Sequence, residues 1–432
     1  MSANHTYVQS EELRAQVHEI QRLENIVEEV RKAEEAASAM IKEMRSRGRQ
    51  FKASLSADRQ RIVSAFQAAE DSVLQSMKTV SDSAQVANVR AQELDKAVGQ
   101  ALGDVQAMLV EKQSQGVSAL EIYQEARAQF TRSQTHPMYQ RFAQGQLESL
   151  AMRISQMSSA DMSASASQLM SMTILTDIYH MDIEVAKKMA EFDVMFAQAA
   201  EAANQLTAYC RNIRNNNRED LEDETSELLD MDFWTDGRFS QLENELKTIM
   251  DRLNGAYDDP TYTTEQLRKD LARLQELTQI ERVLAMSSRT EFNKSNLRKL
   301  QALTCMDILE QSHYFAVVAH GFDMNDEREA YIVRMRRHTD DAEIEVIVNH
   351  GRRDEEFEVY FRIDSTTYRD ENVMSDIRGQ IRDDFAEAGI TMVEYEGCTA
   401  EKLEPITSDS MSISETTRRF HGMTRRQKPS SI

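Results

Sequence analysis

The period of the apolar residues changes near Ser312, and this change limits the folds that the chain can adopt. Before Ser312, apolar side chains recur every three or four positions, which is the period of an α-helix with one buried face. After it, they alternate with polar side chains in short segments, as in strands with one covered face. The sequence therefore predicts a mainly α fold, with a long helical-bundle or coiled-coil body followed by a small α+β domain that contains an antiparallel sheet.

Composition agrees with long helices and excludes some functions. The 432 residues include only 4 prolines and 13 glycines, the residues that most often end helices. A net charge of −22 repels phosphate and anionic lipid, so the body is not expected to bind nucleic acid or a membrane surface. No apolar run of about 18 residues is present, so no membrane span is expected.

The cysteines favour a reducing compartment. Cys210, Cys305 and Cys398 are odd in number and widely separated, without the close spacing of a zinc site. The first residues also lack the basic and apolar regions of a signal peptide. A cytoplasmic location is therefore expected.

Breaks in the pattern divide the chain into five expected segments. Residues 1–136 form long, coiled-coil-like helices, and residues 137–217 form a Met-rich helical region. Residues 218–311 hold an acidic segment and a helical hairpin, and residues 312–404 form the α+β domain. Residues 405–432 are expected to be a disordered basic tail.

Several helix boundaries follow from single residues. The first helix is expected to begin near Ser10 and to kink at Gly48. Residues 80–130 read as continuous helix, and Pro137 forces a break. Residues 155–171, rich in Ser, Ala and Met, fit either a tightly packed helix or a flexible joint.

Turn residues between the alternating segments predict an antiparallel meander. Its apolar face is expected to be covered by a helix over 377–388 and by the helix that precedes the sheet, whereas Glu345, Glu358 and Arg362 predict a solvated opposite face. The expected strands are 314–322, 329–338, 343–348, 356–363 and a last one at 391–396.

A coiled-coil-like seam begins in the first helix and is our first candidate for partner binding. Ile20, Leu23, Val27 and Val30 recur at three- and four-residue spacing, and the pattern continues to Met44. Such a seam favours pairing with another helix, including one from a second copy of the chain.

An acidic stretch over 219–236 ends in the aromatic pair Phe233 and Trp234. Acidic–hydrophobic segments of this kind can dock into a basic, apolar groove on a partner. The alternative is an acidic first helical turn whose aromatic rings pack on the protein itself.

Two groups of arginines are further candidates. Arg352 and Arg353 lie in an expected hairpin turn, where they could hold an anion or pair with neighbouring acids. The basic tail could contact nucleic acid, an anionic surface or an acidic patch on another copy, or it could be a solvated terminus. Its arginines are Arg418, Arg419, Arg425 and Arg426.

His313, His320, His338 and His350 fall within 38 residues of the α+β domain. A metal ion needs several such donors to converge, but strand ends and a turn separate these histidines, so ordinary surface or capping roles are expected and no metal is assigned. The acidic turn at 323–327 resembles the start of a calcium loop but lacks its glycine and its last glutamate.

Motifs for phosphate loops, dinucleotide turns, nucleophile elbows and zinc helices are absent from the sequence, so neither a cofactor nor an enzymatic activity is indicated. The first hypothesis is a non-enzymatic assembly or adaptor protein that binds protein partners, itself included. The alternatives are an accessory or regulatory subunit of a larger ATPase-type machine, and a small metal- or ligand-binding enzyme domain in 312–398.

Overall fold

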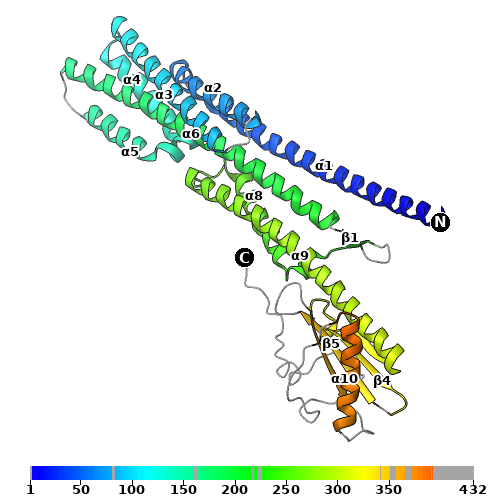
Figure 1. Cartoon of the computed structure of the whole chain (residues 1–432). Helices are drawn as coiled ribbons and strands as arrows, with labels where there is room; N and C mark the ends of the chain where they lie inside the picture. Colours follow the sequence, from blue (N-terminus) through cyan, green and yellow to red (C-terminus); the bar gives the residue numbers. More distant parts are fainter. Residues whose placement is uncertain are drawn as a thin grey trace. The chain divides into compact units, whose positions relative to one another are not determined.

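The computed structural model of the chain describes residues 2–79, 83–159, 163–216, 218–220, 226–340, 342–350, 357–364, 371–390 and 392. Most of these residues are helical, and a four-stranded antiparallel sheet follows near the C-terminal end (Figure 1). The predicted fold class, a mainly α body followed by a small α+β domain, is confirmed.

The chain forms two compact units, and each unit consists of two separate segments of the sequence. Unit 1 consists of Met1–Asn216 and Leu242–Glu281, and unit 2 consists of Asn217–Gln241 and Arg282–Ile432. Two helices, α8 (Arg238–Gly255) and α9 (Thr264–His313), therefore contribute residues to both units. The five segments expected from the sequence stay predictions as domain boundaries.

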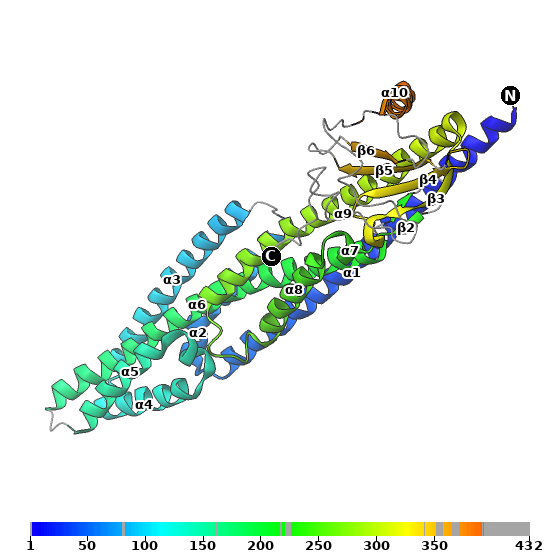
Figure 2. The same cartoon turned by 90° about the horizontal axis from the view of Figure 1, so that it is seen from below.

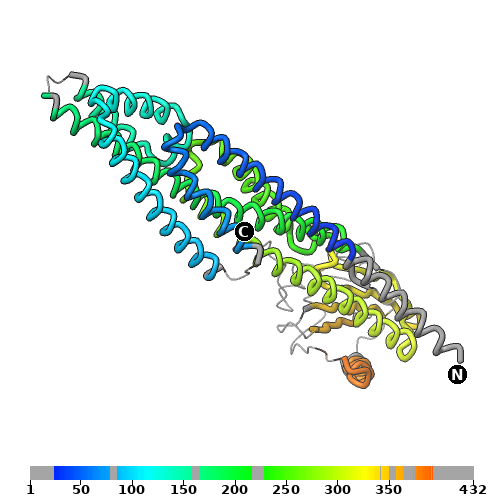
Figure 3. The backbone as a smooth tube through the Cα atoms, turned by 90° about the horizontal axis from the view of Figure 1, so that it is seen from above, coloured from blue at the N-terminus to red at the C-terminus, as the bar shows by residue number. Residues whose placement is uncertain are grey.

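Unit 1 is organised around one long helix, α6, which packs against each of the five helices that precede it. Figure 2 shows α4 and α5 beside one end of α6, and Figure 3 shows the chain turning back from α1 into α2. The helices are α1 (Ser2–Ala53), α2 (Ala57–Thr79), α3 (Ser83–Ser114), α4 (Ala119–Thr135), α5 (Pro137–Ser159) and α6 (Ala164–Asn216).

The central place of α6 follows from its sequence. At about 100° per residue, Phe192, Val194, Met195, Ala197 and Ala200 project in different directions around the helix, and all five are buried. A helix that is apolar on all sides is stable only where neighbouring helices cover it.

A buried polar network ties α2, α4 and α5 to α6. The guanidinium of Arg59 donates to Asp182 at 2.6 Å, to the Tyr139 hydroxyl at 2.6 Å and to the Ser133 hydroxyl at 2.8 Å. Tyr139 in turn donates to Asp182 at 2.6 Å. Because a buried charge is tolerated only when it is paired and hydrogen-bonded, this network fixes which helices meet.

The second passage of the chain through unit 1 is a hairpin made by α8 and the first part of α9. Two ion pairs join its helices: Arg252 lies 2.6 Å from Asp270, and Arg273 lies 2.7 Å from Glu245. Thr263 caps α9, because its hydroxyl accepts a hydrogen bond from the Gln266 amide at 3.2 Å.

Unit 2 contains the sheet. Strands β3 (Ala316–Phe322), β4 (Tyr331–Arg337), β5 (Ala342–His350) and β6 (Phe357–Asp364) are antiparallel neighbours in chain order. The predicted meander is confirmed, and the acidic turn after the first strand is the short 3-10 helix η1 (Asp323–Asn325).

One face of this sheet is covered by two helices. Leu309 of α9 and Phe385 of α10 (Glu371–Glu387) are both buried in one core with Val333, Val346 and other side chains of the same sheet face. The predicted cover by the preceding and the following helix is therefore confirmed. The last predicted strand, at 391–396, lies outside the described residues except for Met392, which makes one parallel bridge to Val359.

The prediction of a solvated opposite face is wrong. Glu345 is 5% exposed and lies between Arg334 at 2.8 Å and Arg362 at 3.6 Å, its register partners on the adjacent strands. Pairing across three strands lets these charged groups be buried. The same face also buries Ile332, Ile347 and Tyr360.

Several local expectations also need correction. The first helix begins at Ser2 rather than near Ser10, and it passes through Gly48 and ends at Ala53. Residues 80–130 are not one helix, because α3 ends at Ser114 and Gly116 adopts a positive φ of 67°. The Ser-rich stretch at 155–171 contains the end of α5 and the start of α6.

The acidic segment before α8 contains structure that the sequence did not predict. Strands β1 (Arg218–Asp220) and β2 (Ser226–Leu228) pair antiparallel, and α7 (Met231–Trp234) follows. Asp230 caps α7 by accepting hydrogen bonds from the two backbone amides of Asp232 and Phe233.

Candidate partner-binding groove

The seam predicted along α1 divides between two faces of the helix. Ala33, Ala37 and Met44 are buried on the face that packs against α6. At about 100° per residue, positions 27 and 41 lie roughly a quarter turn from that face. A strict seven-residue repeat drifts around a straight helix, so one row of apolar residues serves two surfaces.

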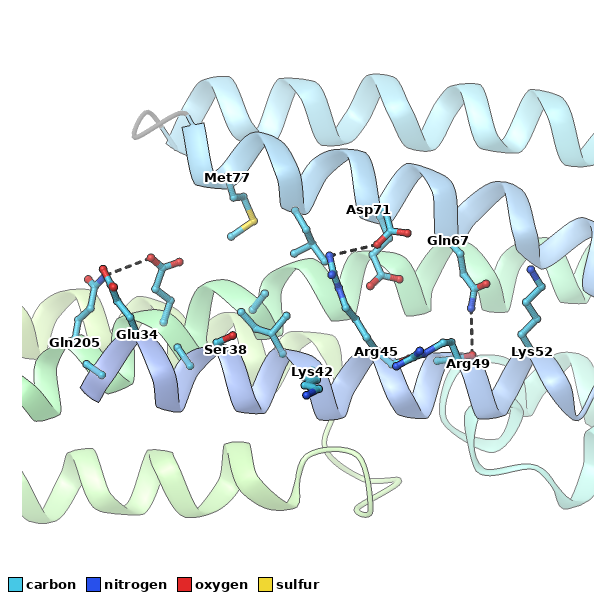
Figure 4. A pocket seen from close by; sticks show the side chains of 18 residues that line it. Glu34, Ser38, Lys42, Arg45, Arg49, Lys52, Gln67, Asp71, Met77 and Gln205 are labelled. Atoms are coloured by element: carbon cyan, nitrogen blue, oxygen red, sulfur yellow. Dashed lines mark hydrogen bonds and ion pairs between the residues drawn. The ribbon is translucent and has the colours of Figure 1, made fainter. Parts of the chain in front are cut away.

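The second face of α1 lines an open groove in unit 1. Helices α1 and α2 each pack on α6 but make few contacts with each other, and the space between them has a volume of about 1100 Å³ (Figure 4). The lining side chains are Ala33, Glu34, Ala37, Ser38, Ile41, Lys42, Arg45, Arg49 and Lys52 of α1, Gln67, Glu70, Asp71, Leu74 and Met77 of α2, and Ala197, Glu201 and Gln205 of α6, with Gly48 also at the wall.

The two long walls of the groove differ in charge. Four basic residues of α1 recur at three- and four-residue spacing: Lys42, Arg45, Arg49 and Lys52. The facing wall on α2 contributes two carboxyl groups. Arg45 reaches across to Asp71 at 3.3 Å, as Figure 4 shows.

A second link crosses the groove, where the Gln67 side chain donates to the Gly48 carbonyl at 3.2 Å. On the side of the Arg45–Asp71 link that lies away from Gln67, the lining includes the apolar side chains of Ile41, Leu74 and Met77 (Figure 4). An apolar lining between walls of opposite charge is suited to an amphipathic segment, whose apolar side would enter the groove and whose polar sides would face the walls.

One carboxyl group of the lining is held neutral. Burial raises the pKa of Glu70 to about 9, the negative charges of Asp193 and Asp71 add to the shift, and Arg45 opposes it. Burial also raises the pKa of Asp193 to about 7, although Tyr257 donates a hydrogen bond to it. Glu70 therefore carries a proton at neutral pH, so the α2 wall is less negative than its sequence indicates.

The predicted seam residues lie on α1 next to this groove. The Val27 side chain is 67% exposed, and Val30 is partly buried. Ile20 and Leu23 lie in the same helix, but their side chains are outside the described part of the structure. Val27 falls on the groove-lining face of α1, so the exposed apolar surface and the groove follow one side of the helix.

The acidic–aromatic candidate is partly enclosed within unit 2. Trp234 is 4% exposed and packs edge-to-face on Phe292 at 5.6 Å, and Phe233 is partly buried beside it. Arg328 lies over the Phe233 ring at 4.4 Å and pairs with Asp236. The Trp234 ring is thus accounted for by internal packing, and docking through this pair stays a prediction.

The four histidines do not form a cluster. His313 ends α9 and lies 2.9 Å from the Asp384 carboxylate, whereas His320 on β3 is hydrogen-bonded to the Tyr331 hydroxyl at 2.7 Å. His338 follows β4 in a turn, and His350 ends β5. Within the described ranges, no three His, Cys, Asp or Glu side chains are grouped as a metal ion requires.

The arginine candidates cannot be placed. Arg352 and Arg353, and the tail residues Arg418, Arg419, Arg425 and Arg426, lie outside the described residues. Conversely, the basic row on α1 was not predicted, although its spacing of 42, 45, 49 and 52 was a readable signal. The carboxyl groups of α2 and α6 that meet this row had no such signal, because nothing in the sequence pairs these helices.

Comparison of the chain with protein-family models, with curated proteins and with solved structures found no match. In the part of the chain that the structure describes, no helix has the length and apolar character needed to cross a membrane. The groove and the exposed face of α1 are therefore the features from which a function has to be argued.

Proposed function

We propose that this protein is a non-enzymatic assembly or adaptor protein that binds a helix of a protein partner along the open face of α1. The observation that carries the proposal is the groove of about 1100 Å³ between α1 and α2, which continues the face that exposes Val27. A helix is about 10 Å across with its side chains, so an elongated groove between α1 and α2 matches the shape of a further helix.

The charges of the groove define the partner's chemistry. Acidic side chains along one flank of a docked helix would face Lys42, Arg49 and Lys52, and apolar side chains would contact Ile41 and Leu74. Burial of apolar surface supplies most of the affinity of such contacts, and the charged walls orient the helix.

The alternatives lack a comparable observation. An enzyme domain in 312–398 rested on the histidines, whose described members have hydrogen-bond partners or end a strand or turn. A role as accessory subunit of an ATPase-type machine remains a special case of the proposal, in which the bound helix belongs to the ATPase.

The test blocks the groove with one bulky side chain. Ser38 is an exposed residue that lines the groove, and Ala36 is an exposed residue on the opposite side of the same helix. Full-length protein, Ser38→Trp and Ala36→Trp are compared in a native pull-down followed by mass spectrometry. We expect the partner chain, or a second copy, to be recovered with the wild type and with Ala36→Trp and to be lost with Ser38→Trp.

Equal recovery of the same proteins by all three would contradict the proposal. The helical circular dichroism signal and the unfolding midpoint of both tryptophan variants are measured beside the pull-down. Because both positions are exposed, neither substitution is expected to change the free energy of unfolding by more than about 0.5 kcal/mol. A loss confined to Ser38→Trp then reports binding rather than folding.

A further inference from the structure

The part of α9 that belongs to unit 2 presents a row of exposed apolar side chains. Val283 is 59% exposed, Met286 71%, Leu297 50% and Leu300 43%. Thr290 and Asn293, both exposed, complete the row at alternating intervals of three and four residues. This is the spacing of a coiled-coil seam. The seam lies apart from the helix side that is buried in unit 2 through Phe292, Ala302 and Cys305.

The first part of α1 carries a seam with the same intervals. Leu13, Gln16, Ile20, Leu23, Val27 and Val30 follow one another at three, four, three, four and three residues. Both seams extend over the same number of residues, and both lie on uninterrupted helices.

The residues that flank the two seams are opposite in charge. On α9, the positions directly beside the seam include Arg282, Arg289 and Lys294. On α1, the corresponding positions include Glu12, Glu19 and Glu24, with Arg31 as an exception at the end. Residues 282–300 carry five basic and one acidic side chains, in a protein whose net charge is −22. Flanking charges of this kind select the partner of a coiled coil.

We infer that the 283–300 face of α9 binds the 13–30 face of α1 from a second copy of this chain. The inference goes beyond the proposed function, because residues 13–30 precede the part of α1 that lines the groove. The groove selects a helix with acidic side chains, whereas the 13–30 face selects a helix with basic ones.

Parallel alignment of the two seams brings opposite charges together. With Leu13 opposite Val283, Glu19 faces Lys294 and Glu24 faces Arg289 across the interface. The apolar residues Val27 and Val30 then lie opposite Leu297 and Leu300.

Pairing of like segments is disfavoured by the same charges. Two α9 segments in parallel would place Arg289 against Lys294, and two α1 segments would place Glu19 against Glu24. Like charges at these positions repel, so the sequence selects the mixed pair over either self-pair.

The polar residues of the α9 seam restrict the register. Asn293 lies opposite Leu23 in the parallel alignment, and Thr290 lies opposite Ile20. Polar side chains in a seam weaken it but limit the alignments in which they remain hydrated or paired. The interface is therefore expected to be moderate in affinity and defined in register.

The test exchanges the flanking charges in the full-length protein. One variant carries Arg289→Glu with Lys294→Glu, a second carries Glu19→Lys with Glu24→Lys, and a third carries all four changes. Lys299→Glu, on the same helix but off the seam, is the control. Dissociation constants for self-association are measured by sedimentation velocity over a wide range of protein concentrations.

We expect each paired substitution to raise the dissociation constant at least about tenfold, since two attractive contacts become repulsive. The fourfold variant is expected to return to within about threefold of the wild type, and Lys299→Glu to leave the value unchanged. A misfolded variant would not be rescued by further charge changes, so the rescue separates binding from folding.

Cross-linking establishes the direction of the pairing. In a Cys398→Ser background, Val27→Cys protein is mixed either with Leu297→Cys protein or with Met286→Cys protein and treated with a short bismaleimide. Parallel pairing gives the heterodimeric product with Leu297→Cys. A product with Met286→Cys alone would indicate the antiparallel arrangement and overturn the stated register.

A full-length protein that remains monomeric at all concentrations would overturn the inference, as would a fourfold variant as weak as its parents. Neither outcome decides the proposed function. If Ser38→Trp still abolishes capture of another protein, the groove is a partner site and the α9 face is not its counterpart.

Discussion

At the scale of single residues, the stability of unit 1 depends on how its buried charges are paired. Asp182 and Arg59 are 1% exposed, and each is the other's counter-ion. Removing one member of such a pair leaves the other charged and buried without a counter-ion. This lowers the free energy of unfolding far more than the loss of a surface contact does.

Asp182→Asn is therefore expected to lower the free energy of unfolding by about 3 kcal/mol, because Arg59 keeps its charge without a counter-ion. The matched control is Asp177→Asn on the same helix, where the paired Arg153 side chain is 45% exposed and water replaces the lost contact. Asp177→Asn is expected to lower the free energy of unfolding by less than about 1 kcal/mol. Urea unfolding of both variants at one pH makes the comparison, and equal effects would show that the Arg59 network adds no stability.

The groove carboxyl group makes stability depend on pH. The pKa of Glu70 is about 9 in the folded protein against 4.5 for the free side chain, because burial, Asp193 and Asp71 outweigh Arg45. A raised pKa means that the folded state holds the proton more tightly than the unfolded state does. The stabilising effect of that proton is complete below pH 4.5 and is lost as the pH rises towards 9.

The Glu70→Gln variant carries a side chain that has the shape of the protonated, neutral carboxyl group but cannot ionise. Relative to the wild type, we expect its free energy of unfolding to increase with pH, by on the order of 1–3 kcal/mol between mildly acidic and mildly basic solution. Asp193 is present in both proteins, so the difference between them reports Glu70 together with its interaction with Asp193. A constant difference across that range would show that Glu70 is already ionised at neutral pH.

At the scale of elements, the residues at the helix ends determine where each helix begins and stops more than helix propensity does. Ser118 begins α4 with a reciprocal cap: its hydroxyl accepts from the Glu121 amide at 3.3 Å, and its own amide donates to the Glu121 carboxylate at 2.9 Å. These hydrogen bonds satisfy amides that have no partner within the helix. The cap follows the turn at Gly116, which separates α3 from α4.

Ser118→Ala is expected to lower the free energy of unfolding by about 1 kcal/mol, because the first turn of α4 loses its side-chain acceptor. Ser114→Ala, at the end of α3, removes only a bond from the side chain to the Glu111 carbonyl and serves as control. Chemical unfolding followed by circular dichroism compares the two. A cost at Ser114 as large as that at Ser118 would assign the effect to the loop and not to the cap.

The sequence predicted the elements whose pattern is strong over many residues. Alternation of the kind seen at Ile344, Val346 and Val348 located the strands, and Pro137 located a helix boundary. The break at Gly116 was missed, because a single glycine in a helical pattern is a weak signal. Strands β1 and β2 were missed, since three residues are too few to show alternation.

For a related reason, the sequence indicated only those residues of the candidate groove that lie on α1. Val27 was identified from spacing within one helix, and Arg45 could have been. Asp71 and Glu201 reach the same groove from α2 and α6, and only the packing of unit 1 brings them there. The spacing of residues along one helix predicts which of them share a face. A groove between helices can be predicted only when it is known which helices are neighbours.

At the scale of the whole molecule, unit 1 is discontinuous in sequence. Its second passage supplies contacts to the first: Arg141 donates to the Ala256 carbonyl at 2.7 Å, Tyr257 donates to Asp193, and Arg214 pairs with Glu243 at 2.7 Å. A fragment that ends at Asn216 lacks all these partners. Residues 1–281 retain them.

We therefore expect fragment 1–216 to unfold at a temperature at least about 5 °C below that of fragment 1–281, since buried groups such as Asp193 lose their partners. Thermal unfolding followed by circular dichroism provides the comparison. Fragment 1–241 is the control for chain length, because it adds residues but not the second passage. If 1–216 and 1–281 melted together, the second passage would add nothing to the stability of unit 1.

The discontinuity of unit 1 also has a consequence for the order of events during synthesis. A ribosome makes α1 to α6 before it makes residues 242–281, and it makes residues 217–241 of the other unit in between. During that interval, Asp193 lacks its hydrogen-bond donor Tyr257, and Arg141 lacks its acceptor, the Ala256 carbonyl. The surface against which these residues later pack is exposed to solvent. The nascent chain thus passes through a stage in which its N-terminal helices are complete in sequence but unfinished in packing. Such stages are open to aggregation and to chaperones.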